Sequence, residues 1–525
     1  MTATIREACA AAGALLLVCS AAPLAQMPMP GAEPLRSLSR GDVTTESPTE
    51  HTLLLLALAD GADASTTIRP FDAKTRARLF AAVDTAATRM LMWTPVAGSV
   101  WFNSTRPRFD RDGAVWQGRG MTAAVAGGLE AHYSVLHVAL RPIAFATQNR
   151  PYTPLSDRPL TANDFRQPFT FTGPYIDLPY RFGPNTLARL DPGESFVTAE
   201  AGPLSAGFST ASQHWGPANF YPLVMGVEAP GYPRAFVQVT ALPLGIGRGS
   251  LNWSLGRLES SGFAQLAPGR RSRALPAVVA TFQPAGLPGV EIGGTRVMQQ
   301  RWTSESASME TALEPFGAIF KNSVRANAPE TNQLASVFVR IAPPRAGIEV
   351  YGELLRDDHN VTVVDLFGEP DHESAYVVGL RRAWRNAQGA VRAVTVETAN
   401  GRISHLQRVR PQASMYIHTA ITEGHTNRGQ LLGSSAVFGG GGTTVSYESV
   451  QESRSFGVEG SVRRSVQNWE GGTWNGRVSG FAELRVRTTR IVRDRPLGWS
   501  VGVDHGFGFE RGTNLTLQQT FDRLF

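Results

Sequence analysis

The chain has 525 residues, of which 42% are hydrophobic and 18% are charged, and its formal net charge is +6. These values exclude a disordered chain and a helical membrane protein, while the length allows several domains or one large barrel. Among the 50 basic residues only Lys74 and Lys321 are lysines. Arginine forks suit the carboxylates and phosphates of acidic ligands, but we favour ion pairs with Asp and Glu for most of them.

The N-terminus has the pattern of a secretory signal peptide. An apolar run from Ala8 to Val18 follows Arg6 and precedes small residues up to Ala25, which predicts a signal peptide over residues 1–25. Both cysteines lie inside it, so the mature chain has neither disulfides nor thiolate chemistry. No later stretch approaches the ~20 apolar residues of a transmembrane helix, so a membrane location would require a barrel.

Residues 26–97 are predicted to form a small helical periplasmic segment. Leu53 to Leu58 are predicted to form one short helix, with Thr49 and Ser47 as candidate caps and Gly61 at its end. Apolar residues recur at helical spacing from Pro70 to Leu91, which predicts a second helix. An N-terminal subdomain of a soluble fold would show the same pattern.

From residue 98 to residue 525 the pattern is one of strands and turns, and it predicts an all-β domain. At about ten residues per strand, this length allows roughly 16–20 barrel strands. Residues 150–190 and 262–335 are polar and interrupted by Pro and Gly, so we expect extended loops there. The clearest strands are Thr122 to Leu140, Ser195 to Ser209, Ala235 to Leu242, Ser250 to Leu258, Ile348 to Leu355, Tyr376 to Trp384, Val391 to Thr398, Ser414 to Ile421 and Thr443 to Gln451.

The last fifty residues show the clearest alternation. Leu484 and Val486 face away from Glu483 and Arg485, and similar alternation continues to Phe525, the last residue. A period of two places all apolar groups on one face of a sheet, which suits a strand with lipid outside and a hydrated lumen inside. The final hairpins of a soluble β-sandwich alternate in the same way.

The sequence shows no catalytic constellation, metal site or cofactor motif. The tetraglycine Gly439 to Gly442 lacks the Lys-Ser/Thr of a phosphate loop. The acidic and histidine residues at 357–359 and 371–373 lack a recognised ligand spacing and are predicted to be solvated loop residues. Carboxylate pairs for glycoside hydrolysis depend on geometry and stay open.

One stretch of the sequence suggests a function for the barrel. At Trp215-Gly216-Pro217 a strand ends in a turn, a compact loop follows, and the next strand begins after Ala229-Pro230-Gly231-Tyr232-Pro233. This pattern resembles the capsule assembly Wzi family of outer-membrane proteins. The helical stretch from Gly41 to Leu79 is also similar to that family.

Further motifs extend the resemblance over most of the mature chain. Tyr416-Ile417-His418 and Gly424 to Gly429 resemble the family's Tyr…Gly-Tyr-x-x-x-Gly pattern, and Asp357 and Asp358 match an acidic position before a long loop. The chain departs from the pattern at His425, where Tyr is usual, and at Ala218, where Gly is usual.

The resemblance implies a barrel of about eighteen strands with a periplasmic helical bundle in the bacterial outer membrane. It also implies a non-enzymatic, lectin-like protein that helps to attach or assemble capsular polysaccharide or exopolysaccharide at the cell surface. An exposed Trp215 beside Gln213 and His214 would suit stacking and hydrogen bonding to a sugar. Trp215 could instead lock the turn, and Arg428 could form either a lumen ion pair or a contact with an acidic sugar.

The predicted partners are this polysaccharide, outer-membrane lipids and lipopolysaccharide, and the barrel assembly machinery acting on the strand that ends at Phe525. No nucleic acid is expected. A diffusion porin is the alternative function, because polar lumen faces would also line a channel. A secreted, soluble glycan-active enzyme on a β fold is a third hypothesis.

Overall fold

The computed structural model of the chain describes most of the segment between residues 44 and 521. The described residues are 44–61, 65–72, 75, 79, 91–108, 111, 113–154, 160–168, 176–264, 271–317, 331–357, 368–369, 371–403, 413–451, 453–464, 480–492, 495–507 and 512–521. The predicted signal peptide and Phe525 lie outside them.

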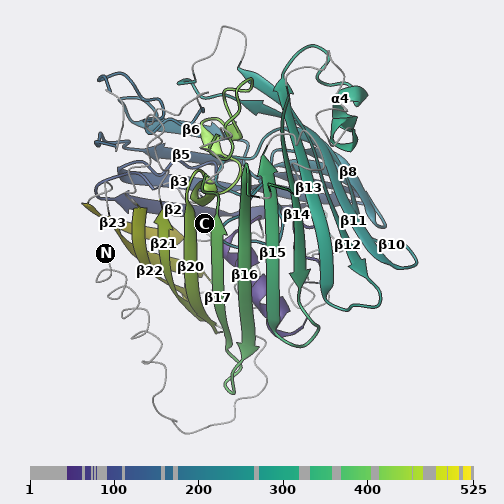
Figure 1. Cartoon of the computed structure of the whole chain (residues 1–525). Helices are drawn as coiled ribbons and strands as arrows, with labels where there is room; N and C mark the ends of the chain where they lie inside the picture. The colour runs from purple at the N-terminus through teal and green to yellow at the C-terminus, as the bar shows by residue number, and fades with distance from the viewer. Residues whose placement is uncertain are drawn as a thin grey trace.

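Antiparallel strands form a closed barrel with 18 strand positions, and β2 closes it by pairing with both β3 and β24 (Figure 1). Two positions are each filled by two short strands, β4 with β5 and β6 with β7. The strands are β2 (Leu91–Asn103), β3 (Gly120–Tyr133), β4 (Leu136–Leu140), β5 (Ile143–Thr147), β6 (Leu187–Asp191), β7 (Phe196–Ala201), β8 (Leu204–Ser209), β10 (Arg234–Pro243), β11 (Gly247–Glu259), β12 (Ser272–Pro284), β13 (Val290–Arg301), β14 (Thr331–Ile341), β15 (Ile348–Asp357), β16 (Ser374–Arg385), β17 (Val391–Asn400), β20 (Gly441–Val450), β21 (Arg454–Arg464), β22 (Gly480–Val492), β23 (Arg495–Phe507) and β24 (Gly512–Phe521). The predicted transmembrane all-β barrel is confirmed.

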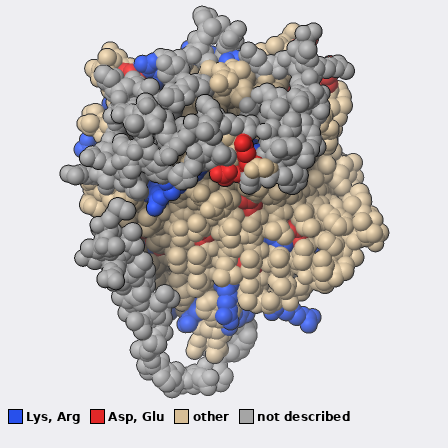
Figure 2. Space-filling model, viewed as in Figure 1, with Lys and Arg blue, Asp and Glu red and all other residues tan. Residues whose placement is uncertain are grey.

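The barrel wall is apolar outside and polar inside. On β22 the side chains of Leu484 and Val486 are exposed, while Glu483 and Arg485 face the lumen and pair with each other. The predicted alternation of the closing strands is therefore confirmed, and it continues on β23, where Val501 and other apolar side chains are exposed. Figure 2 shows the result as a broad band of mostly uncharged surface on the side of the wall in view, with basic side chains along its lower edge. Such a band matches the lipid-facing surface of a transmembrane barrel.

The two ends of the barrel differ in the length of their connections. At one end, adjacent strands are joined by short turns such as the one between β16 and β17, at the bottom of Figure 1. At the other end the connections are long, such as the one from β17 to β20. We call these the short-turn end and the long-loop end. In outer-membrane barrels short turns face the periplasm and long loops face outward.

The prediction of one extended loop over residues 262–335 is wrong, because β12 and β13 and the start of β14 lie within it. The cause is a second buried face: most of β12 is buried on both sides, so its sequence does not alternate. A short helix, α4 (Met309–Leu313), and the turn η1 (Glu314–Phe316) pack beside this part of the wall. Trp253 of β11 donates a hydrogen bond to the Ala312 carbonyl there, at 2.6 Å.

The predicted strand from Ser414 to Ile421 is also wrong. These residues form turns and bends without strand pairing, inside the long connection between β17 and β20. Their apolar residues Met415, Tyr416 and Ile417 are buried in the main hydrophobic cluster. Burial on all sides gives an irregular segment the apolar content of a strand.

Near the N-terminus, the helix predicted around Leu53 is confirmed as α2 (Pro48–Ala59), with Ser47 as its N-cap. It packs inside the short-turn end, where Leu55 contacts inward-facing side chains of β16 and β17. The boundary predicted between residues 97 and 98 falls inside β2, and most of the second predicted helix lies outside the described residues. No helix within the described ranges is long and apolar enough to cross a membrane.

Candidate functional site: a plug in the barrel lumen

Two connections fold back into the lumen and pack against the inner face of the wall. They are residues 210–233, between β8 and β10, and residues 413–440, between β17 and β20; we call them together the plug. Nearly all of their side chains are buried, and they form one hydrophobic cluster with inward-facing residues of the wall. A connection with so much apolar surface needs burial, and the lumen supplies it. The largest fully buried side chains of the plug are Trp215, Tyr221, Leu223, Met225 and Tyr416.

The wall binds the first half of the plug through a buried carboxylate. Glu397 of β17 accepts hydrogen bonds from three consecutive backbone N–H groups, those of Asn219, Phe220 and Tyr221, at 2.6, 2.9 and 2.7 Å. These three hydrogen bonds satisfy buried donors of the loop and fix its backbone against the wall. Tyr221 adds a hydroxyl contact with Thr444 of β20 at 2.5 Å.

The second half is held by Arg273 of β12, whose side chain is fully buried. The guanidinium donates to the carbonyls of Gly424 and Thr426 at 2.5 and 2.7 Å, and to the side-chain oxygen of Gln299 at 2.8 Å. The carboxylate of Glu423 lies 3.9 Å from it. One buried cation therefore satisfies several inward-facing acceptors at once, as a buried charge requires.

His425 joins the two halves of the plug. Its Nε2 donates to the Val224 carbonyl at 2.7 Å, and its Nδ1 accepts from the Gln299 amide at 2.8 Å. With one nitrogen donating and the other accepting, the imidazole is neutral. Burial lowers the pKa of His425 to about 4, and the nearby charge of Arg273 acts in the same direction. Tyr416 makes a parallel link by donating to the Leu223 carbonyl at 2.7 Å.

Three of the residues predicted to bind polysaccharide lie on the short-turn side of the plug. His214 and Trp215 form the two-residue strand β9, which pairs with β1 (Ile68–Arg69) from the N-terminal segment. Trp215 is 0% exposed, so the prediction of an exposed tryptophan is wrong. Gln213 is also buried and accepts a hydrogen bond from the Tyr232 hydroxyl at 2.7 Å.

The Trp-Gly-Pro turn fixes the plug against the wall and the N-terminal segment. Gly216 adopts a φ of +93°, and a Cβ there would lie 2.4 Å from the carboxylate of Glu353. Its N–H donates to the Thr67 carbonyl at 2.9 Å, which ties the turn to the N-terminal segment. The structure thus supports the alternative in which Trp215 locks the turn.

His214 faces charged residues of the N-terminal segment. Its Nδ1 forms a hydrogen bond with the carboxylate of Glu46 at 2.5 Å. Burial lowers the pKa of His214 to about 4, with Arg69 as the next contribution. The imidazole is therefore neutral near pH 7 and donates to Glu46. Burial raises the pKa of Glu46, but the contact with His214 and the nearby charges of Arg111 and Arg69 together outweigh burial, so Glu46 stays ionised.

Arg428 lies elsewhere, between β6 and β11. Its guanidinium pairs with Asp191 at 2.5 Å, and its backbone N–H donates to the Glu259 carbonyl at 2.7 Å. The side chain is thus an ion-pair partner inside the barrel, which was one of its two predicted roles. The four predicted residues do not converge on one surface, and their role in binding polysaccharide stays a prediction.

The long-loop end has a basic and aromatic pair that the sequence analysis missed, an exposed arginine beside a half-buried tryptophan. The guanidinium of Arg257, at the end of β11, lies 5.1 Å from the ring centroid of Trp302, just after β13. The Arg257 side chain is 46% exposed and is oriented by Glu259 and Ser272. The available sequence signal was an arginine and a tryptophan at strand ends that become neighbours only when β11, β12 and β13 pair.

The fold and its apolar outer surface define the class: this is an outer-membrane β-barrel, and its lumen holds the plug. No family model and no curated protein matches the sequence.

Solved structures of outer-membrane barrels do resemble it. One is Wzi, an outer membrane protein involved in group 1 capsule assembly in Escherichia coli and a carbohydrate-binding β-barrel, with 12% identity and a TM-score of 0.61 over 91% of this chain and 99% of Wzi. OpdK of Pseudomonas aeruginosa has 8% identity and a TM-score of 0.39 over 81% and 98% of the two chains. A BenF-like porin from Pseudomonas fluorescens Pf-5 has 7% identity and a TM-score of 0.41 over 82% and 98%. The similarity to Wzi concerns the fold, and the other two carry no further argument.

Proposed function

We propose that this protein is a non-enzymatic, lectin-like member of the Wzi family that helps to attach or assemble capsular polysaccharide or exopolysaccharide at the outer face of the outer membrane. The observation that carries the proposal is the plug in the lumen. A diffusion porin needs a continuous water path, whereas residues 210–233 and 413–440 are buried in one hydrophobic cluster with the wall. The fold similarity to a carbohydrate-binding barrel supports the same function.

The binding surface that we propose is the long-loop end. Arginine presents a planar fork to carboxylates and phosphates, and a tryptophan face stacks on sugar rings and cations. At this rim Arg257 is exposed and lies beside the half-buried ring of Trp302. In this proposal Gln213, His214 and Trp215 act indirectly by holding the plug. Outer-membrane lipids, lipopolysaccharide and the barrel assembly machinery are the further partners.

The first experiment tests attachment and closure together. A strain that lacks the protein should release its surface polysaccharide into the medium, as measured by capsule staining and by assay of acidic sugars in the supernatant. The purified protein in planar bilayers should give no large steady conductance at pH 7.5. Full retention of polysaccharide by the deletion strain would contradict the proposal, and large steady channels would favour the porin.

The second experiment tests the surface with a matched control. Arg257→Ala with Trp302→Ala should reduce polysaccharide retention while heat-modifiability on a gel shows a normally folded barrel. The control is Arg382→Ala with Trp384→Ala. This pair has the same residue types near the short-turn end, with the Arg382 guanidinium 5.6 Å from the centroid of the Trp384 ring. Equal retention by the two double variants would show that Arg257 and Trp302 do not contact the polysaccharide.

A further inference from the structure

The hairpin of β3 and β4 brings together three metal-ligating side chains. Its two-residue turn, Ser134 and Val135, has Ser134 at a φ of +55°, and the strand pairing places His132 directly opposite His137. Glu130 lies two residues before His132 on β3, so both side chains are on the same face of the strand. That face is the lumen side, since Glu130 and His137 are buried.

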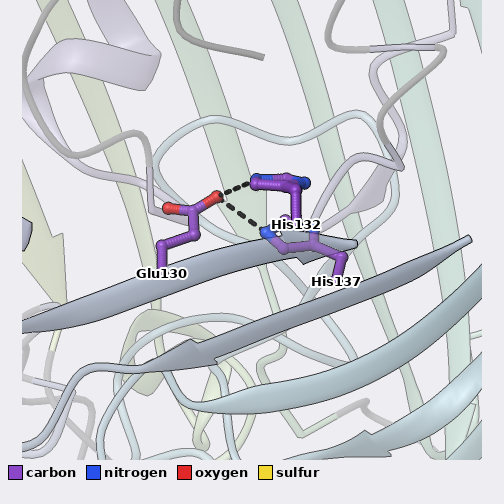
Figure 3. Close-up of side chains that lie close together, drawn as sticks. All are labelled: Glu130, His132 and His137. Carbon is purple, nitrogen blue, oxygen red and sulfur yellow. Dashed lines mark hydrogen bonds and ion pairs between the residues drawn. The ribbon is translucent and has the colours of Figure 1, made fainter. Parts of the chain in front are cut away.

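The three side chains meet at one point (Figure 3). Oε1 of Glu130 lies 2.9 Å from Nε2 of His132 and 2.7 Å from Nε2 of His137. The two imidazoles are stacked, with ring centroids 3.8 Å apart and planes 25° from parallel. One ligand atom from each residue lies within 4.8 Å of the others. The side-chain exposure is 8% for Glu130, 9% for His137 and 31% for His132, so the group is both enclosed and reachable.

We propose that Glu130, His132 and His137 bind a divalent transition metal of the zinc class at the short-turn end of the lumen. Two imidazoles and one carboxylate are a common protein ligand set for Zn²⁺, at about 2.0–2.2 Å from each donor, with a fourth position for water. Hard cations such as Mg²⁺ and Ca²⁺ prefer oxygen ligands and fit this set less well.

The neighbours of the cluster suit this role. Oε2 of Glu130 accepts a hydrogen bond from Arg141, so the carboxylate is held from behind while Oε1 faces the histidines. Groups that orient ligands in this way are part of most metal sites. A cavity lined by His137, Arg141 and Phe196, among others, adjoins the cluster and gives space for the ion and its water.

Hydrogen bonding alone is the simpler alternative for these residues. In it both imidazoles donate Nε2–H to one carboxylate oxygen, and the charge of Arg141 opposes any cation. A bound metal would replace those two hydrogen bonds by three coordinate bonds, with each imidazole binding through Nε2 and carrying its proton on Nδ1, and it would fix the hairpin that the turn already forms. The two alternatives differ in one measurable property, which is stoichiometric metal binding.

The experiment uses the full-length barrel in detergent without an oligohistidine tag, and Zn²⁺ as the probe. Calorimetry and elemental analysis should show one Zn²⁺ per chain. His132→Gln, His137→Gln and Glu130→Gln should each weaken binding at least about tenfold, because even the outer-shell partners of ligands contribute about 10–100-fold. The control is His505→Gln, since His505 is exposed on β23 and bonded to Thr513.

Heat-modifiability on a gel confirms that each variant is folded. Replacement of Zn²⁺ by Co²⁺ provides a second readout, because a site with two imidazole ligands gives visible absorption bands that the His132→Gln variant should lose. The proposal is overturned if the wild type retains no Zn²⁺, or if the three ligand variants bind it as tightly as His505→Gln does.

Discussion

Acidification should loosen the plug, because two of its buried histidines are kept neutral. His214 forms a hydrogen bond with Glu46 and lies near the positive charges of Arg69 and Arg111. His425 forms hydrogen bonds with Gln299 and the Val224 carbonyl and lies near the positive charge of Arg273. Each has a pKa lowered from 6.5 to about 4 by burial. A plug segment released to water would recover the ordinary value.

The direction and size of the effect of pH on plug stability follow from the protons that each state binds. Between pH 6.5 and about 4 the released state binds a proton that the packed state does not, so the stability of the packed state falls as the pH falls. At pH 5, about 1.5 units below the ordinary histidine pKa, the released state is almost fully protonated and the packed state is not. The free energy of the packed state relative to the released state then changes by about 2 kcal/mol for each histidine, which is about a 30-fold change in the opening equilibrium. Burial raises the pKa of Glu50 and of Asp177, and protonation of these two carboxyls works in the opposite direction.

A thiol probe can measure this opening, since both natural cysteines lie in the predicted signal peptide. Ser414→Cys places the probe in the plug, where the serine hydroxyl is buried without a hydrogen-bond partner. Its reaction with dithiodipyridine, relative to that of Gln388→Cys in the exposed turn between β16 and β17, should increase from pH 7.5 to pH 5.

The comparison between variants isolates the histidines. His214→Gln with His425→Gln should give a smaller increase with acid, because glutamine does not titrate and the contributions of Glu50 and Asp177 are common to both proteins. The reasoning is refuted if the relative reactivity of Ser414→Cys is the same at both pH values, or if the double variant shows the same increase as the parent.

Three further outcomes are expected. Trp215→Ala should destabilise the plug by about 3–5 kcal/mol, because it leaves a cavity. Bilayer recordings of this variant should show conductance, whereas the control Trp499→Ala, on the exposed face of β23, should show none. Arg273→Met should destabilise the plug by about 3–5 kcal/mol because it leaves the partners of a buried cation unsatisfied, and thiol reactivity of the plug should rise as with acid; an unchanged reactivity would contradict the anchoring role. Deletion of Phe525 should reduce the heat-modifiable barrel in outer-membrane fractions, and normal insertion would argue against its role as an assembly signal.

The wall could be predicted where one face of a strand meets lipid and the other meets polar groups. On β22 and β23 this condition holds, and the predicted alternation is the observed one. On β12 it fails for two reasons. Leu275, Ala277 and Val279 face the lumen and pack with the plug, so the inner face is apolar, and residues after β13 cover part of the outer face. Periodicity reports the environment of a strand, so a strand that is buried on both sides gives no alternating signal.

The functional site was harder to predict, because a connection inside a lumen and a connection outside it are both irregular. The Trp-Gly-Pro turn was located correctly, but the exposure of Trp215 depends on where the loop folds. The apolar run from Phe220 to Met225 was a usable signal, since an external loop seldom carries so much apolar surface. His132 and His137 gave another, because they flank a two-residue turn and must face each other once the hairpin forms.

The contacts of the N-terminal segment imply that it and the plug open as one unit. β1 pairs with β9 of the plug, and Glu46 bonds to His214, so the segment holds the plug from the short-turn side. The segment is itself attached to the wall, where His51 contacts Glu448 of β20 at 2.8 Å. Loss of these wall contacts would therefore weaken the pairing of β1 with β9, although the plug sequence is unchanged. A barrel that lacks the segment should show the thiol reactivity of an acidified plug already at pH 7.5, because the packing of the plug depends on both of its ends.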